Sequence, residues 1–198
     1  MSITPTDELG AVNSMLASIG EASVMSLNSG DLEDVTLART ALSEVSLAVQ
    51  TDGWHWNTES RFPLTPDENG TIHLPANLLH LAVDPFRYPA VDPVPRGKRL
   101  YDRASHSFRF REKIEATIVL ALAFDEMPEV ARRYITMRAS RLFQDRATGS
   151  VTLAQLAEGE INRAWVALRQ DENRSRSPSI LAHPTSRHPF FSPRSVLR

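Results

Sequence analysis

The chain has 198 residues, a formal net charge of −2, 41% hydrophobic residues and no cysteine. This length allows one domain, or two small ones, with a substantial hydrophobic core. The lack of cysteine excludes disulfides, cysteine-based metal sites and a thiol nucleophile. The longest apolar run, residues 118–124, is too short to cross a membrane, and no basic segment followed by an apolar block opens the chain. We therefore expect no membrane span and no signal peptide.

Two amphipathic helices are predicted at the start of the chain. Apolar residues recur at spacings of three and four at Leu9, Val12, Leu16 and Ile19. This period predicts a helix over residues 7–19, which Gly20 is placed to end. A second helix is expected to begin near Asp31, a favourable N-cap, and to end before Gly53.

Residues 53–124 have the period-two alternation of short strands, separated by turn-forming residues. Strands are expected at 54–57, 62–64, 72–74, 79–83 and 114–124. Residues 98–102 and 107–110 are expected to pair as a hairpin, and residues 85–97 to form a loop. Together these segments predict a small antiparallel sheet between helices.

Two more helices are predicted after the sheet, over residues 128–146 and 152–171. The four helices can bury their apolar stripes only against each other or against the sheet. We therefore predict an α+β fold, in which residues 1–52 and 126–172 form a four-helix bundle and residues 53–125 form an inserted antiparallel β domain.

Residues 173–198 are predicted to form an extended basic tail. They hold five of the 22 basic residues and no acidic residue, so the other 17 basic residues are combined with 24 acidic ones. Its prolines interrupt helices, and alone it cannot bury enough apolar area to offset the entropy of ordering. An acidic body with a basic tail suggests a partner that accepts positive charge. The tail residues expected to bind that partner are Arg174, Arg176, Ile180, Leu181, Arg187, Phe190, Phe191, Arg194 and Arg198.

The residues that could carry out chemistry each have a plainer interpretation. Asp125, Glu126 and Glu129 lie together at a helix start, where negative charge favours the helix dipole, whereas a glycosidase needs two carboxylates held apart. The histidines form no ligand pair at helical spacing, and they are His55, His73, His80, His106, His183 and His188. No phosphate-binding glycine loop and no G-x-S-x-G motif is present. We expect no catalytic residue, no cofactor and no metal site.

Two patterns leave alternatives open. Trp54 and Trp56 flank a histidine and favour core packing over a carbohydrate- or base-stacking platform. Five arginines lie along the third helix, at Arg132, Arg133, Arg138, Arg141 and Arg146. They favour a solvated face or pairs with acids between subunits over a nucleic-acid face, because no exposed aromatic residues interleave with them. A nucleic-acid-binding protein would show affinity that falls steeply with salt.

Four motifs occur along the chain in a fixed order. They are Ala11-Val12-Asn13-x-x-Leu16-x-x-Ile19-Gly20-Glu21, Gly53-Trp54-x-Trp56-Asn57, Tyr101-Asp102-Arg103, and Asp125-Glu126-Met127-Pro128 followed by Tyr134 and Arg138-Ala139-Ser140-Arg141-x-Phe143. Together they resemble the tail tubular protein A, or head-to-tail adaptor, family of short-tailed bacteriophages of the T7 type. The resemblance covers about residues 7–171.

The resemblance implies a structural virion protein that is not an enzyme. Such proteins form a ring, expected to be twelve-fold, that joins the portal to the tail nozzle, a protein of the tail tubular protein B type, and extends the DNA channel. Double-stranded DNA is expected to pass without specific recognition. The helical bundle is implied to build the ring wall, the β insertion to project as a wing, and the C-terminal segment to reach the portal.

The expected location is the virion tail, after assembly in the cytoplasm of the host bacterium and without a membrane. The alternative hypothesis is a cell-wall or polysaccharide hydrolase carried in the virion. That activity requires two separated acids or a metal site, and the sequence offers neither clearly.

Overall fold

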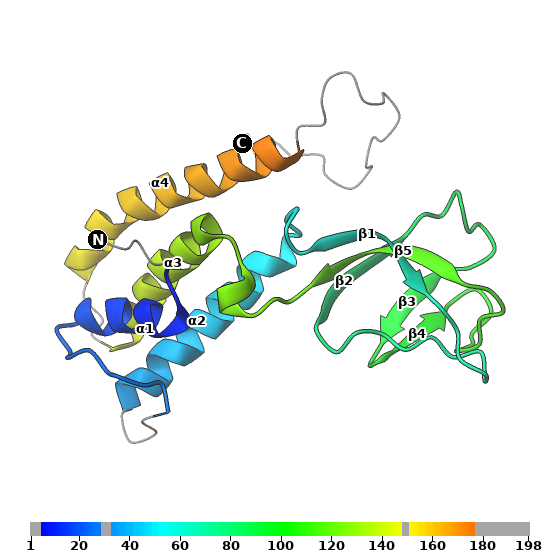
Figure 1. The fold of residues 1–198 in the computed structure, drawn as a ribbon, viewed down its shortest axis with the longest axis horizontal. Coiled ribbons are helices and arrows are strands. Elements are labelled where there is room, and N and C mark those ends of the chain that lie inside the picture. Colours follow the sequence, from blue (N-terminus) through cyan, green and yellow to red (C-terminus); the bar gives the residue numbers. More distant parts are fainter. Residues whose placement is uncertain (1–4, 29–32, 148–150, 177–198) are drawn as a thin grey trace.

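The computed structural model describes residues 5–28, 33–147 and 151–176, apart from the side chains of 151–157 and 176. Within these ranges it combines four α-helices with two small antiparallel sheets (Figure 1), which confirms the predicted α+β class. The elements are α1 (Glu8–Ala17), α2 (Glu33–Thr51), β1 (Thr58–Leu64), β2 (Leu78–Val83), β3 (Pro93–Arg96), β4 (Arg99–Asp102), β5 (Ile114–Leu120), the short 3-10 helix η1 (Phe124–Glu126), α3 (Glu129–Ala147) and α4 (Val151–Arg176).

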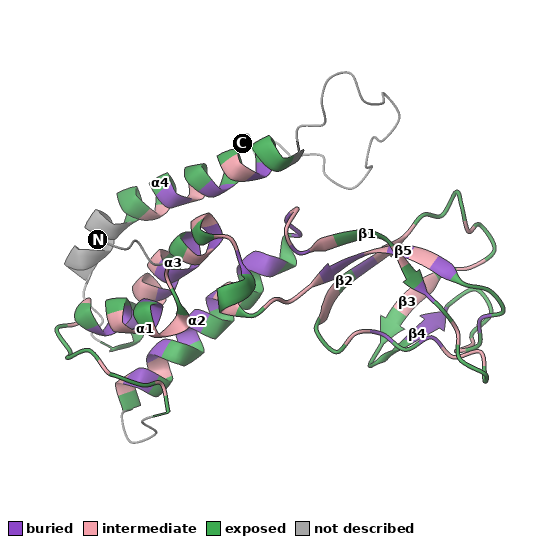
Figure 2. Cartoon of the chain, in the orientation of Figure 1, coloured by how far each residue is buried: buried purple, intermediate pink, exposed green. Residues whose placement is uncertain are grey.

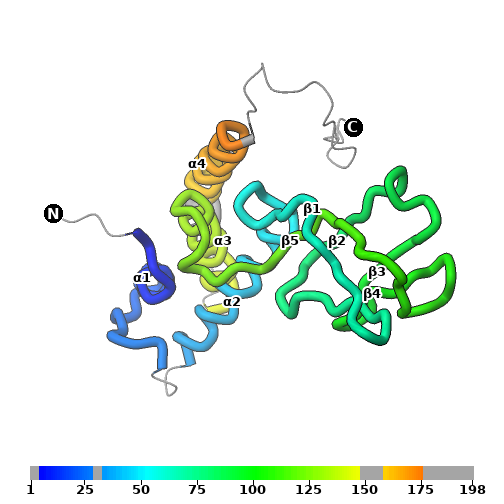
Figure 3. Tube along the Cα trace, turned by 45° about the vertical axis from the view of Figure 1, so that its right-hand side comes forward, coloured from blue at the N-terminus to red at the C-terminus, as the bar shows by residue number. Residues whose placement is uncertain are grey.

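Helix α3 lies in the middle of the helical part. It packs against α1 and α2 on one side and against α4 on the other, while α1 and α2 also pack against each other. Figures 1 and 3 show α4 running along α3 as an outer layer. The helices are therefore layered around α3, and the closed four-helix bundle of the prediction is not confirmed.

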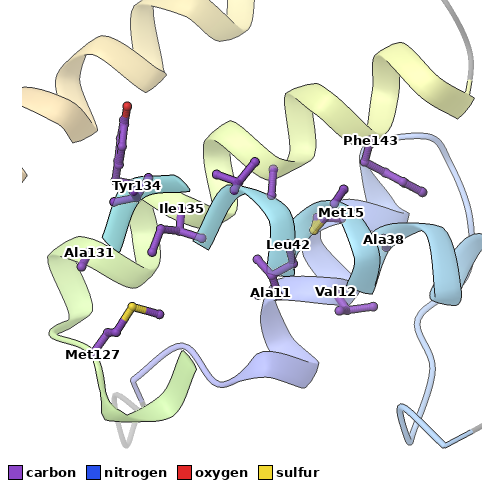
Figure 4. Packing of buried hydrophobic residues seen from close by; sticks show 14 of the residues in the cluster. Ala11, Val12, Met15, Ala38, Leu42, Met127, Ala131, Tyr134, Ile135 and Phe143 are labelled. Carbon is purple, nitrogen blue, oxygen red and sulfur yellow. The ribbon is translucent and has the colours of Figure 1, made fainter. Parts of the chain in front are cut away.

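Small and large side chains alternate where α1, α2 and α3 meet. Ala11, Ala38 and Ala131 are fully or almost fully buried and let the helices approach closely, while Met15 and Phe143 fill the space between them (Figure 4). Each such large side chain contributes about 1.5–3 kcal/mol through burial. The buried sides of the helices face one another in Figure 2, and their exposed sides face outward.

The sheets form a second hydrophobic cluster beside the helices. Strand β5 lies between β1 and β2 in a three-stranded antiparallel sheet, and β3 pairs with β4. Leu64, Ile72, Leu100 and Ile118 lie at the centre of this cluster, each at most 2% exposed. The sheet part extends away from the helices in Figure 1 and is joined to them through the ends of β1 and β5.

The prediction paired residues 98–102 with the wrong strand. Residues 99–102 pair with 93–96, which were expected to be loop, and they meet 107–110 only through an isolated bridge between Asp102 and Ser107. The reason is the two-residue connection at Gly97, whose φ of 61° is favourable only for glycine. Proline is tolerated in β3 because this strand lies at a sheet edge.

Further predictions differ from the structure. Residues 72–74, expected to be a strand, form only an isolated bridge between His73 and Arg99, and the strand expected at 114–124 ends at Leu120. Trp54 and Trp56 lie in a turn before β1 and not in a strand. Helix α4 continues beyond the predicted end at Asp171, so Arg174 and Arg176 belong to its last turn and not to an extended segment. The predicted N-cap at Asp31 lies outside the described residues.

Candidate functional site

The Asp-Glu-Met-Pro motif fastens the N-terminal segment to the start of α3. Asp125 Oδ1 accepts the backbone N–H of Glu8 at 3.2 Å, and Glu126 accepts the N–H of the residue three before it at 3.0 Å. Glu129 accepts both the N–H (2.9 Å) and the hydroxyl (2.8 Å) of Thr6. Arg132 donates to the Thr6 carbonyl at 2.8 Å. All three carboxylates therefore bind backbone groups.

The Ala-Val-Asn motif fixes the connection that follows α1. The side-chain amide of Asn13 donates to the carbonyl of Val24 at 3.0 Å and accepts the N–H of the same residue at 2.8 Å. Gly20 ends the helical turn with a φ of 85°. Asparagine is the appropriate side chain here because its amide can pair with both backbone groups of one residue.

The Gly-Trp-x-Trp-Asn motif joins α2 to the central strand of the larger sheet. Asn57 is 3% exposed, and its Nδ2 donates to the carbonyls of Gln50 (2.9 Å) and Leu120 (3.0 Å). Its Oδ1 accepts the N–H of Trp54 at 2.8 Å, and the indole of Trp54 donates to the carbonyl of Val49 at 2.7 Å. One buried amide therefore connects α2, the turn and β5.

The same turn also holds α4. The Trp54 ring packs edge-on against Trp165 at 5.6 Å between ring centroids, and Trp165 contacts Tyr134 of α3 at 5.2 Å. Glu172 accepts the backbone N–H of His55 at 3.0 Å and contacts its Nδ1 at 2.6 Å. Trp54 is 2% exposed, so the prediction that this tryptophan packs in the core is confirmed.

The Tyr-Asp-Arg motif closes the turn after β4. Asp102 is 3% exposed and accepts the backbone N–H groups of Asp92 (2.8 Å), Ala104 (3.1 Å) and Ser105 (3.2 Å), and the Ser105 hydroxyl at 2.5 Å. Burial alone would raise the pKa of Asp102, but these hydrogen bonds, led by the Ser105 hydroxyl, outweigh it and hold the pKa below 3.8. Arg103 pairs with Asp92 at 2.8 Å.

Most arginines of α3 are engaged within the chain. The pairs are Arg132–Glu129 (3.5 Å), Arg141–Asp145 (3.0 Å) and Arg146–Glu44 (2.8 Å). Arg133 and Arg138 make no ion pair with any residue that the structure describes. Acidic side chains of the same chain therefore neutralise most of the positive charge on this helix.

The described residues contain no group of three or more histidine or acidic side chains that could hold a metal ion. His55 and His73 each contact a single carboxylate, on Glu172 and Asp67, respectively. His183 and His188 lie outside the described residues. No described helix is long and apolar enough to cross a membrane.

Of the nine tail residues expected to bind a partner, the structure describes two. Arg174 lies exposed on the last turn of α4, and Arg176 ends this helix. The other seven lie outside the described residues.

Two surface features were missed by sequence reasoning. Phe86, in the connection from β2 to β3, is 92% exposed. An open groove of about 310 Å³ lies between α3 and α4. An Asp-Pro-Phe-Arg-Tyr-Pro stretch could have indicated a displayed aromatic residue, whereas the groove depends on how two distant helices pack.

All four motifs thus hold the backbone through side-chain hydrogen bonds: two of them join segments far apart in the sequence, and the other two close local turns. The chain matches the tail tubular protein family over residues 9–178. A relative described as "Tail tubular protein A", from Klebsiella phage KP34, is 33% identical over 131 residues, which are 65% of this chain and 66% of the relative. The match therefore spans just under two thirds of that relative's length.

The chain belongs to the tail tubular protein family. It is a structural protein of the phage tail and so a component of the virion.

Proposed function

We propose that this protein is the ring-forming adaptor that joins the portal to the tail nozzle and extends the DNA channel. The observation that carries this proposal is the extent of the family match, which runs through the helices and the sheets and includes all four motifs. The name of the similar protein from phage KP34, tail tubular protein A, supports it further.

In this proposal the layered helices build the ring wall, and the sheet part projects as a wing (Figure 1). Identical subunits close a ring through a heterologous interface, in which one face of each copy meets a different face of the next. The proposed ring has twelve copies and meets a nozzle of the tail tubular protein B type. The excess of acidic residues before residue 173 suits a channel that lets DNA pass without gripping it.

The basic tail is proposed to bind the portal. Arg174 projects from the end of α4, and the remaining tail arginines follow it without any intervening acid. Ile180, Leu181, Phe190 and Phe191 would supply apolar anchors. Assembly is proposed to take place in the host cytoplasm, before the protein takes its place in the tail.

We propose no catalytic role. Asp125, Glu126 and Glu129 are each bound to backbone N–H groups, so no observation on these acids favours the alternative of a cell-wall or polysaccharide hydrolase.

Particle imaging with the portal of the same phage tests the proposal. The full chain is compared with a chain that ends after Arg176, because a shorter chain would lose Glu172 and its contact with His55. A ring stacked on the portal by the full chain alone supports the adaptor function and a tail that docks. Stacking by both chains keeps the adaptor and removes the tail from this role, and stacking by neither contradicts the proposal.

A charge test separates the tail's basic character from its length. Changing Arg187, Arg194 and Arg198 together to glutamate should abolish stacking, whereas changing the same three to lysine should preserve most of it. Equal stacking by both variants would contradict an electrostatic contribution.

A further inference from the structure

The loop after β2 displays a phenylalanine in a fixed position. Phe86 donates its N–H to Asp84 Oδ1 at 2.9 Å, and Tyr88 donates its N–H to the Asp84 carbonyl at 3.1 Å. The Tyr88 hydroxyl accepts the N–H of Glu115 at 3.0 Å, and Arg87 pairs with the Glu115 carboxylate at 2.6 Å. The loop is thus tied to β5 by the two residues that follow its tip, Arg87 and Tyr88, while Asp84 closes the turn before it.

This arrangement leaves an aromatic side chain in water on an anchored backbone. Phe86 is 92% exposed although its loop is well anchored. A rigid aromatic group loses little entropy when it binds, which is why such residues dominate the energetics of many interfaces. A single exposed apolar residue is common on proteins, so the loop alone indicates no site.

The groove between α3 and α4 has the size and the apolar lining to accept an aromatic ring such as that of Phe86. Its apolar lining residues are Val130 and Met137 of α3 and Ala164 and Ala167 of α4. Its charged lining residues, called the rim below, are Arg133, Arg163 and Glu160. Its volume of about 310 Å³ is ample for a phenyl ring, since a cavity of about 150 Å³ binds benzene.

The charges at the rim favour an acidic occupant. Arg163 is paired with Glu160 at 3.5 Å, whereas Arg133 makes no ion pair with any described residue. On the loop, Asp84 uses Oδ1 to hold the turn and is exposed, so Oδ2 is available to a cation. The positive charge of Arg87 is already paired with Glu115. The two surfaces therefore complement each other in size and in charge.

We propose that Phe86 of one copy inserts into the α3–α4 groove of the neighbouring copy, with Asp84 facing Arg133. The ring would contact the sulfur of Met137 and a guanidinium of the rim. The loop and the groove are different faces of the chain, so the contact is heterologous and can repeat around a ring. This inference rests on the ring of the proposed function and identifies one of its interfaces.

Other occupants of the groove fit less well. The remaining large apolar residues that the structure describes as exposed are Met25, Leu47 and Val166. None of them is aromatic, and Leu47 and Val166 are only 49% and 51% exposed. Phe190 and Phe191 lie in the basic tail, whose arginines would meet the two arginines of the rim.

The absence of cysteine makes a direct test possible. A full-length F86C variant is mixed with a full-length A167C variant, assembled with the portal and oxidised. A disulfide forms only when the two α-carbons come within about 7 Å. We expect a cross-linked dimer from the mixture and none from either variant alone, because each then carries only one of the two cysteines needed at the interface.

The matched control is M25C mixed with A167C, because Met25 is 95% exposed and so equally available for non-specific collision. A cross-link with F86C but not with M25C supports the interface. Equal cross-linking by both overturns it, as does a link formed within one chain by an F191C/A167C double variant, which would show that the chain's own tail covers the groove.

Whether rings form on the portal distinguishes a failure of this inference from a failure of the proposed function. Rings that form on the portal without the cross-link overturn the interface and leave the adaptor proposal intact. Absence of rings from the unmodified full-length chain contradicts both proposals. With the interface present, F86A should weaken ring formation at least about tenfold, whereas M25A should leave it unchanged.

Discussion

Replacing Asp102 by asparagine removes one negative charge from the buried turn after β4 and keeps the shape of the side chain. The Asp102 carboxylate accepts three backbone N–H groups and one hydroxyl, and the residue is only 3% exposed. The substitution tests whether this turn depends on a charged acceptor.

The magnitude follows from the four hydrogen bonds. The asparagine carbonyl can take over the two bonds from Asp92 and Ala104, but its NH₂ group then faces the N–H of Ser105. The Ser105 hydroxyl can turn to accept, so one backbone donor loses its partner. An unsatisfied buried donor costs about 1–3 kcal/mol, and the bonds that remain are weaker without the charge. We expect D102N to lower the free energy of unfolding by about 3 kcal/mol.

The free energy of unfolding that D102N loses should depend on pH in a defined direction. Because the pKa of Asp102 in the folded protein is held below 3.8, its stabilising effect is present in full above that value and is lost as the pH falls through the folded-state pKa. The asparagine variant has no such contribution to lose. In urea unfolding followed by circular dichroism, the unfolding free energies of the unmodified protein and D102N should therefore differ by the same amount at pH 7 and pH 5. The difference should be smaller at pH 3.

The control for this experiment is D92N in the same turn. Asp92 is 51% exposed and pairs with Arg103 at the surface, so this change should cost no more than about 0.5 kcal/mol. If D102N proves as stable as D92N, or if the difference in unfolding free energy between D102N and the unmodified protein grows at low pH, the turn does not depend on a charged acceptor.

Other substitutions test the hydrogen bonds of the remaining motifs and the loop that carries Phe86. N57A removes three buried hydrogen bonds at the junction of helices and sheet and should cost about 3 kcal/mol in urea unfolding. E129A should release the N-terminal segment, so that the amide of Thr6 exchanges with solvent faster while amides near Asn13 keep their rates; unchanged exchange at Thr6 would contradict the proposed clamp. F86A should change the unfolding free energy by less than about 0.5 kcal/mol, because the side chain is 92% exposed.

Local signals in the sequence predicted the helices well. The N-cap of α1 is a side chain of the adjacent residue, Asp7, which accepts the N–H of Gly10 at 2.7 Å. Such a contact spans only a few residues, so a sequence pattern contains it. The prediction ended this helix at Asp171 because residues 172–176 continue no apolar period. They also contain no helix-breaking residue, and in the structure α4 continues to Arg176.

Strand pairing was harder to predict because both candidate partners of residues 99–102 are close in sequence. Pro93 and Pro95 made the true partner look like loop, although an edge strand tolerates residues without an N–H. The choice depends on the turn at Gly97, which aligns Arg96 with Arg99.

The motifs pointed to the family but not to their physical roles. Glu129 binds Thr6 across 123 positions of sequence, and Asn57 reaches Leu120 across 63. No local pattern contains such contacts. The groove between α3 and α4 is likewise a product of helix packing, since its lining residues are distributed over two helices.

A reconstruction of the intact virion tail is the decisive test of the ring-forming adaptor. We expect a closed ring of this chain between the portal and the nozzle, with α1–α4 in the ring wall, the sheets projecting from it and DNA passing through its opening. Density for this chain on the outside of the tail, as separate copies that do not encircle the DNA, would contradict it.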